Sequence, residues 1–320
     1  MQMQVKALCN LLRREDSSGE PWQLTDYRSL SLEEIFHRLK SLGVDLNEES
    51  FLIEAEPLDT PEELVRVVTE ENEQPVYLLL FELWRRLLPG KESISIFCDA
   101  LDQLIEQYEK KPIGDALQKK LDDLHTVLEE NHDIGGSPHD IFAVVSSYSS
   151  YDLQMFLFDY IEDQIDAGHT VNAADMIEDF YPYVGDPVWF DLLRARLLSA
   201  KEPHEANLLF KTILEHIEEH PDLDLLLEMA SFLVHHGDPQ LFQETVSKAF
   251  ELLRTEEDFQ ELVAIIADYY GSVDKTKEEK ALQNLFARRS KQPLGQNLNK
   301  EDPDVLSLAT LLQNPKWSEI

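Results

Sequence analysis

Two histidines and a glutamate near residue 220 have the residue types and spacing of a zinc site. His216 and His220 lie four residues apart, so on a helix both imidazoles share one face and can bind Zn²⁺. Glu219 completes an H-x-x-E-H arrangement, in which a glutamate can act as a general base. A third ligand is required, and only Glu278 and Glu279 are crude candidates. We therefore expect neither a metal cofactor nor a catalytic site here, and we keep a metal-dependent hydrolase as an alternative function.

A second set of oxygen-bearing side chains, between Asp45 and Glu56, has the spacing of a calcium loop. Ser50, however, occupies the position where the sharp turn of such a loop requires glycine. Asn47 is a good residue to precede a helix and accept a hydrogen bond from its first turn. We expect a capped helix start rather than a calcium site.

Ser137, His139 and Asp140 bring together the three residue types of a hydrolytic triad. Neighbouring side chains diverge, whereas a triad needs side chains that converge across the fold. Ser137 is better explained as the residue that precedes a helix beginning at Pro138. The sequence therefore predicts a protein that is not an enzyme.

The charge of the chain is strongly negative and unevenly distributed. Its 320 residues carry a formal net charge of −35, and residues 121–193 contain no Lys or Arg and 16 Asp or Glu. Such a field repels nucleic-acid phosphates and anionic lipid headgroups and attracts basic peptides. We expect no nucleic-acid or membrane partner. Solubility alone is the other explanation of an acidic surface.

Composition favours an all-α fold in a reducing compartment. The chain is 43% hydrophobic, its long stretches are rich in leucine and glutamate, and no long alternating Val/Ile/Thr run predicts a sheet. Cys9 and Cys98 form no metal or redox motif, and the N-terminus lacks the apolar region of a secretory signal. The apolar run 76–88 is interrupted by charges and too short to span a bilayer. We predict a cytoplasmic protein and leave its oligomeric state open.

Turn-forming residues divide the chain into four parts. We expect an N-terminal helical region at 1–131, a boundary or capping segment at 132–149, a repeat array at 150–289 and a polar C-terminal tail at 290–320 with one short helix. The helices predicted outside the array cover residues 2–14, 32–42, 61–72, 75–88, 92–110, 114–131, 138–148 and 304–313.

The array is predicted from a period near 34 residues. Turns centred on Gly168, Gly237 and Gly271 lie 69 and 34 residues apart, and a small residue precedes a turn in each of three segments. Such a period is typical of stacked helical hairpins, which bury their apolar faces only against their neighbours. We expect hairpins at 150–184, 187–221, 222–256 and 257–289.

The apolar residues of two of these segments have a spacing that resembles a known family. Leu226, Met229, Ala230 and Leu233 precede Gly237, and Ala206 and Phe210 reproduce an A-x-x-x-F spacing in the preceding segment. On these residues the array resembles tetratricopeptide repeats, although no segment has the full Trp…Leu-Gly…Tyr pattern. The resemblance implies an αα-superhelix whose first helices line a groove for extended peptides or helices. The groove residues that it implies are Phe158, Glu162, Trp189, Leu192, Arg196, Leu227, Ser231, His235 and Glu261.

These observations favour a non-enzymatic adaptor or chaperone that binds a basic or amphipathic protein segment. In outline, an acidic repeat protein also resembles the secretion chaperones of bacteria, which is a second alternative. A further hypothesis concerns the tail: Arg288, Arg289 and Lys291 form the best basic cluster, and the chain beyond them could occupy the array's own groove.

Overall fold

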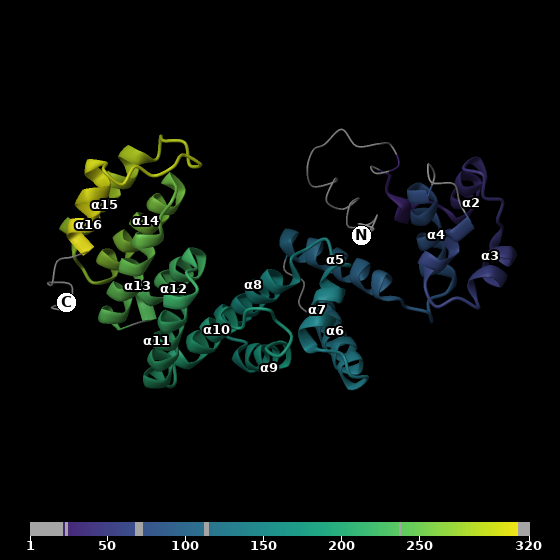
Figure 1. Cartoon of the computed structure of the whole chain (residues 1–320), viewed down its shortest axis with the longest axis horizontal. Coiled ribbons are helices and arrows are strands. Elements are labelled where there is room, and N and C mark those ends of the chain that lie inside the picture. Colours follow the sequence, from purple (N-terminus) through teal and green to yellow (C-terminus); the bar gives the residue numbers. More distant parts are fainter. Residues whose placement is uncertain (1–21, 23–24, 68–72, 112–114, 237, 313–320) are drawn as a thin grey trace. The chain divides into compact units, whose positions relative to one another are not determined.

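The computed structural model describes residues 22, 25–67, 73–111, 115–236 and 238–312, and these residues form an all-helical protein (Figure 1). They contain fifteen α-helices, two 3₁₀ helices and no strand. The helix expected at 2–14, Gly237 and the end of the tail lie outside the described residues. None of the described helices is both long enough and apolar enough to cross a membrane.

The chain divides into two compact units, residues 1–156 and 157–320, which we describe separately. The helix α8 (Leu153–Asp166) crosses the division. The described elements of the first unit are η1 (Tyr27–Ser29), α2 (Leu32–Ser41), α3 (Glu48–Ala55), η2 (Pro61–Val67), α4 (Glu73–Leu87), α5 (Ile94–Lys110), α6 (Asp115–Asp133) and α7 (Pro138–Ser146).

Local hydrogen bonds explain where the early helices begin and end. The Ser31 hydroxyl accepts from the backbone of Glu34, whose carboxylate accepts in return from the Ser31 backbone N–H, 2.8 Å away. Asn47 and Ser50 make the same reciprocal pair at the start of α3, so this segment is a capped helix start, as expected. Gly43 follows α2 with φ +90°, a conformation that favours glycine.

The prediction of an α-helix at 61–72 is wrong for residues 61–67, which are the part that the structure describes. Residues 61–67 form the 3₁₀ helix η2, and the Glu63 N–H donates to the Thr60 carbonyl at 3.3 Å, a bond between residues three apart. Several β-branched residues follow in this stretch, and such residues weaken an α-helix by losing side-chain freedom. A good helix start at Thr60-Pro61 therefore does not lead to an α-helix here.

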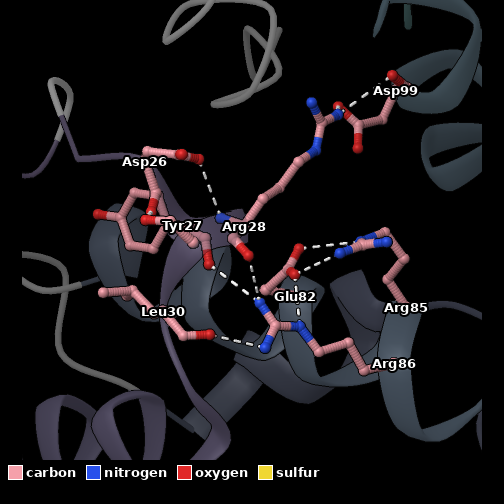
Figure 2. Close-up of polar contacts among 9 residues, drawn as sticks. Asp26, Tyr27, Arg28, Leu30, Glu82, Arg85, Arg86 and Asp99 are labelled. Carbon is pink, nitrogen blue, oxygen red and sulfur yellow. Dashed lines mark hydrogen bonds and ion pairs between the residues drawn. The ribbon is translucent and has the colours of Figure 1, made fainter.

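Helix α4 contributes both apolar and charged side chains to the interior of the first unit. Phe81, Leu83 and Trp84 are buried in a core that also takes up Ile35 and Leu39 of α2. Glu82, only 2% exposed, pairs with two arginines of the same helix, Arg85 and Arg86 (Figure 2).

Arg86 attaches the segment before α2 to this helix. Its guanidinium donates to the carbonyls of Leu30 and Arg28, at 2.7 and 2.9 Å. Arg28 extends in the other direction and pairs with buried Asp99 of α5, as Figure 2 shows. Because each arginine satisfies buried acceptors on another element, this polar cluster serves the fold of the first unit.

The second unit is a stack of helical hairpins. Helices α10 and α11, α12 and α13, and α14 and α15 pack as antiparallel pairs; α10 contacts α12, α12 contacts α14, and α11 contacts α13. The elements that complete this unit are α8 (Leu153–Asp166), α9 (Thr170–Phe180), α10 (Val188–Ser199), α11 (Pro203–Glu219), α12 (Leu223–His236), α13 (Pro239–Leu252), α14 (Glu256–Ser272), α15 (Thr276–Arg289) and α16 (Pro303–Leu312). We call α8, α10, α12 and α14 the first helices and α9, α11, α13 and α15 the second helices.

Proline and glycine lie at most of the helix starts and turns where the sequence predicts them, and Gly271 is the exception. Pro203 and Pro239 open α11 and α13, where the missing N–H costs nothing. Gly168 makes the expected turn with φ +80°. Gly271, expected at a turn, instead lies inside α14, and Asp274 takes the left-handed conformation with φ 59°. The helix continues past Gly271 because one glycine costs only about 1 kcal/mol, which packing along α14 offsets.

The tail closes the C-terminal end of the stack. Residues 294–298 run along the start of α14, where the Glu256 N–H donates to the Gln296 carbonyl at 2.9 Å. Helix α16 packs on α13 and buries Val305, Leu308 and Leu312. Within this cluster Arg288 pairs with Asp304 and Arg289 is buried. Residues 313–320 lie outside the described residues, so occupation of the groove by the tail stays a prediction.

Candidate functional site

The first helices of the second unit share one acidic face. Asp159, Glu162, Asp163 and Asp166 lie on α8, Arg196 on α10, Asp224 and Glu228 on α12, and Glu261 on α14; we call this set the carboxylate face. Its members act on one another electrostatically across the helices, since Glu228 affects Asp159 and Glu162 on one side and Glu261 on the other. The face therefore extends over three hairpins and into a fourth.

Arg196 is the cation at the centre of this face. Its Nη1 pairs with Glu162 of α8 and lies 3.0 Å from Oε1 of Glu228 on α12, while its Nη2 lies 3.6 Å from Asp166. The guanidinium also lies over the Phe232 ring, 5.0 Å from its centroid. Because the Arg196 side chain is only 8% exposed, its carboxylate partners hold it in a largely dry position.

Glu162 carries the largest electrostatic perturbation of the face. Burial raises the pKa of its carboxyl group to about 7, and the negative charge of Glu228 adds to this effect, while Arg196 opposes it. A carboxyl group with this pKa gains and loses its proton near neutrality.

Asp159 and Glu261 experience repulsion from neighbouring carboxylates in addition to burial. Burial raises the pKa of Asp159, and repulsion by Asp163 and Glu228 raises it further. Burial likewise raises the pKa of Glu261, followed by repulsion from Asp224, Asp258, Glu228 and Glu257. Each of these groups is destabilised in its charged form, so a cation brought near it would be attracted.

An aromatic pair lies at one end of the first helices. Trp189 of α10 packs edge to face on Phe158 of α8, with ring centroids 5.0 Å apart. The Trp189 indole N–H donates to Asp222 Oδ2 at 3.2 Å, and the other oxygen of Asp222 accepts from the first turn of α12. Trp189 is half-buried, so it combines a fixed orientation with accessible apolar surface.

The residues implied for a groove fall into two groups. Glu162, Trp189, Arg196, Ser231, His235 and Glu261 are partly or fully accessible. Phe158, Leu192 and Leu227 are at most 4% exposed, because the first helices pack on one another along these positions. These three side chains belong to the core and offer no contact area to a partner, which corrects their assignment to the groove.

Five residues of the face are not among those expected from the sequence: Asp159, Asp163, Asp166, Asp224 and Glu228. A signal for Glu228 exists in the sequence, because opposite charges recur at nearly the repeat period: Glu162, Arg196 and Glu228 lie 34 and 32 residues apart. Residues one period apart lie side by side on neighbouring first helices, so such a pattern predicts ion pairs across the stack.

The described residues bring no third ligand to the zinc-like motif. The rings of His216 and His220 lie 4.9 Å apart, and the intervening Glu218 pairs with Lys248 at 2.6 Å. Among the described residues, no group of three or more His, Cys, Asp or Glu side chains is arranged to hold a metal ion. Glu219 and the crude candidates on α15 therefore complete no site with the two histidines.

A second surface feature lies between α9, α10 and α11. It is a hollow of about 450 Å³ whose lining includes Val171, Leu197 and Leu209, with Asp175 and Lys201 among its charged residues. Val171 is 74% exposed. Because its charges have both signs, this hollow does not select a partner by charge, in contrast to the carboxylate face.

Comparison with known proteins assigns the chain to no family: no family model, curated protein or solved structure matches it. We therefore infer function from the geometry and charge of the site itself.

Proposed function

We propose that this protein is a non-enzymatic helical-repeat adaptor or chaperone of the tetratricopeptide type, which holds a basic or amphipathic segment of a partner protein on the carboxylate face. The supporting architecture is the hairpin stack, in which successive first helices present their side chains on one continuous surface. We further propose that the protein acts in the cytoplasm.

The observation that carries this proposal is the excess of carboxylates over cations on one face. The face carries seven carboxylates and one arginine, only three of the seven pair with Arg196, and the pKa values of Asp159, Glu162 and Glu261 are all raised. In the isolated protein this arrangement is costly, because like charges repel in a partly desolvated setting. A partner's guanidinium or ammonium groups would relieve the repulsion, so the face favours a basic segment.

The apolar part of the contact would come from Trp189. Its ring is oriented by Phe158 and by the hydrogen bond to Asp222, and an oriented aromatic side chain adds contact area at little entropic cost. An amphipathic segment with arginines on one side and leucines on the other fits this combination.

Binding of a short synthetic peptide rich in arginine and leucine tests the proposal. Isothermal titration calorimetry at pH 8 should show saturable binding that weakens as the salt concentration rises to roughly 0.3 M, because salt screens exposed charges. A peptide with glutamate in place of arginine should not bind.

Two double variants distinguish binding by the carboxylate face from general attraction to the net negative charge of the protein. Asp159→Asn with Glu261→Gln removes two charges from the face, and Glu205→Gln with Glu215→Gln removes two from exposed positions of α11. We expect the first variant to bind the arginine peptide about tenfold more weakly and the second to bind within about twofold of wild type. An equal loss in both would mean general attraction to an acidic protein and would overturn the proposal.

A further inference from the structure

Helix α16 shows which kind of element packs across two second helices of the stack. Its first turn is tied to the end of α15, where Arg288 pairs with Asp304 at 2.7 Å. Its last residue, Leu312, lies near the start of α13, where its carbonyl accepts from the side chain of Gln243 at 3.5 Å. The helix packs on α13 and buries its apolar side (Figure 1). A short amphipathic helix therefore bridges α15 and α13.

The hollow between α9, α10 and α11 lies at the corresponding place two hairpins earlier. Adding 69 to the numbers of the four buried residues of α9 gives four buried residues of α13, so the two helices have the same register. By this shift, Ala174 in the lining is the counterpart of Gln243. Leu197 in the lining is only partly buried, whereas its counterpart Ile266 is fully buried. Among the described helices, the hollow has no counterpart of α16.

The N-terminal sequence repeats the apolar pattern of α16. Residues 5–12 read VKALCNLL and residues 305–312 read VLSLATLL. The buried residues of α16, which are Val305, Leu308 and Leu312, correspond to Val5, Leu8 and Leu12. The exposed Leu306 corresponds to Lys6. The helix expected at 2–14 would therefore present the same apolar side as α16 and a more polar opposite side.

The start of this segment suits α11 better than the start of α16 would. In α16, Asp304 pairs with an arginine at the end of α15. The N-terminal segment has Gln4 at the corresponding position, and α11 contains no arginine. In the orientation of α16, the segment would begin at α11 and end at the start of α9 without an unpaired acid at its first turn.

The end of the segment carries the charges that fit the start of α9. Arg13 and Arg14 follow directly after Leu12. Their place in the hollow is beside Ala174, which the exposed carboxylate of Asp175 follows in the lining. The apolar pattern thus selects the segment, and the ion pairs with Asp175 set its direction.

We propose that residues 2–14 of a second copy of this chain dock in the hollow as a helix, in the way that α16 packs on α13. Exchange of a short element between copies is a low-cost route to association. The hollow shares no lining residue with the carboxylate face, so the inference does not depend on the proposed function. The protein associates with itself through one surface and holds its basic partner on another.

The first test measures self-association of full-length variants. Sedimentation velocity over a range of concentrations should show reversible association of the wild type. Leu8→Asp and Val171→Asp should each weaken it at least about tenfold, because each places a charge in the apolar contact. Val171 is exposed, so its substitution should leave the fold intact. Leu208→Asp is the matched control, since Leu208 is 50% exposed on α11 outside the lining, and it should associate like the wild type.

A mixture of two variants identifies the copy that supplies the segment. Leu8→Asp lacks a competent segment and Val171→Asp lacks a competent hollow, so each alone should stay monomeric. Their equimolar mixture should form a complex through the one remaining pair of intact surfaces. A monomeric wild type, or a mixture that forms no complex, would overturn the exchange between copies.

A peptide tests the site itself. A fluorescent peptide of residues 1–16 should bind full-length Leu8→Asp and should bind the double variant Leu8→Asp with Val171→Asp at least about tenfold more weakly, as measured by fluorescence anisotropy. Equal binding to the two proteins would place the peptide elsewhere on the acidic surface and would overturn the inference, as would no binding to either.

Charge reversal tests the direction of the segment. Asp175→Arg, in the Leu8→Asp background, should weaken binding of the peptide, and a peptide with Arg13→Glu and Arg14→Glu should recover it. Loss of binding without recovery would overturn the ion pairs with Asp175. The arginine–leucine peptide should bind Val171→Asp as it binds the wild type, so failure of the docking and failure of the proposed function are distinguishable.

Discussion

The guanidinium of Arg289 lies buried against the carboxylate of Glu256, 33 residues earlier in the chain. The two side chains are 4% and 2% exposed, and Nε of Arg289 donates to Oε1 of Glu256 at 2.8 Å. Nη1 of Arg289 also lies 2.9 Å from Asp302, just before α16. Burial works to raise the pKa of Glu256, but hydrogen bonds from Arg289 and Gln260 outweigh it and lower the pKa. One arginine thus joins α15, α14 and the tail.

Loss of this arginine should strongly destabilise the second unit. We expect Arg289→Ala to lower the free energy of unfolding by about 3–5 kcal/mol, because it leaves a buried carboxylate without its partner. Arg288→Ala is the matched control, since the Arg288 side chain is 61% exposed and its pairing with Asp304 should contribute about 1 kcal/mol or less. Urea unfolding followed by circular dichroism measures both, and similar losses would contradict the role given to Arg289.

Two leucines of α16 allow a direct comparison of its buried and exposed sides. Leu308 is 1% exposed and Leu306 is 53% exposed. We expect Leu308→Ala to cost about 2–4 kcal/mol, because it removes buried apolar surface and leaves a cavity, and Leu306→Ala to change stability by about 0.5 kcal/mol or less. Thermal unfolding of the two variants would show whether the tail is part of the folded stack.

In the first unit, Asp102 holds the segment that precedes α8. Its oxygens accept from the hydroxyl of Ser149 at 2.6 Å and from the backbone N–H and hydroxyl of Ser150 at 2.9 and 2.8 Å. We expect Asp102→Ala to destabilise this unit by about 1–3 kcal/mol, because the serine donors lose their acceptor. Asp123→Ala, on an exposed position of α6, should be nearly neutral in the same denaturation experiment.

The raised pKa of Glu162 also makes a prediction about stability. The unfolded chain releases this proton near 4.5 and the folded protein near 7, so between these values the folded state binds more protons. This group's contribution to stability therefore falls as the pH rises through that window. Glu162→Gln lacks the contribution, so its stability minus that of the wild type should increase from about pH 5 to pH 7.5.

Urea midpoints of the wild type and Glu162→Gln at several pH values test this difference, and Glu205→Gln serves as a control with the same change in charge at an exposed site. Parallel pH profiles for the wild type and Glu162→Gln would contradict the prediction.

The helical hairpins could be predicted from the sequence because their boundaries depend on local chemistry. Pro203 and Pro239 open helices, Gly168 makes a turn, and Asn47 caps a helix, as their residue types indicate. Gly271 shows the limit of this reasoning, since packing along α14 outweighs the tendency of glycine to end a helix.

The carboxylate face was only partly predictable, because it depends on register between helices. The repeat pattern predicts that Glu162, Arg196 and Glu261 lie on the array surface. Which carboxylates Arg196 binds depends on how far neighbouring hairpins are shifted along one another. Phe158 illustrates the opposite error: periodicity places it on a first helix, and only the packing of Trp189 against it shows that it is buried.

The ion pairs of Arg196 also affect how the array unfolds. In an ideal solenoid each repeat touches only its neighbours, so the ends can fray one repeat at a time. Arg196 on α10 binds Glu162 on α8 and Glu228 on α12, so one side chain contributes to both interfaces of its hairpin. Unfolding of this hairpin would weaken both interfaces at once, so the three hairpins should melt together rather than one after another.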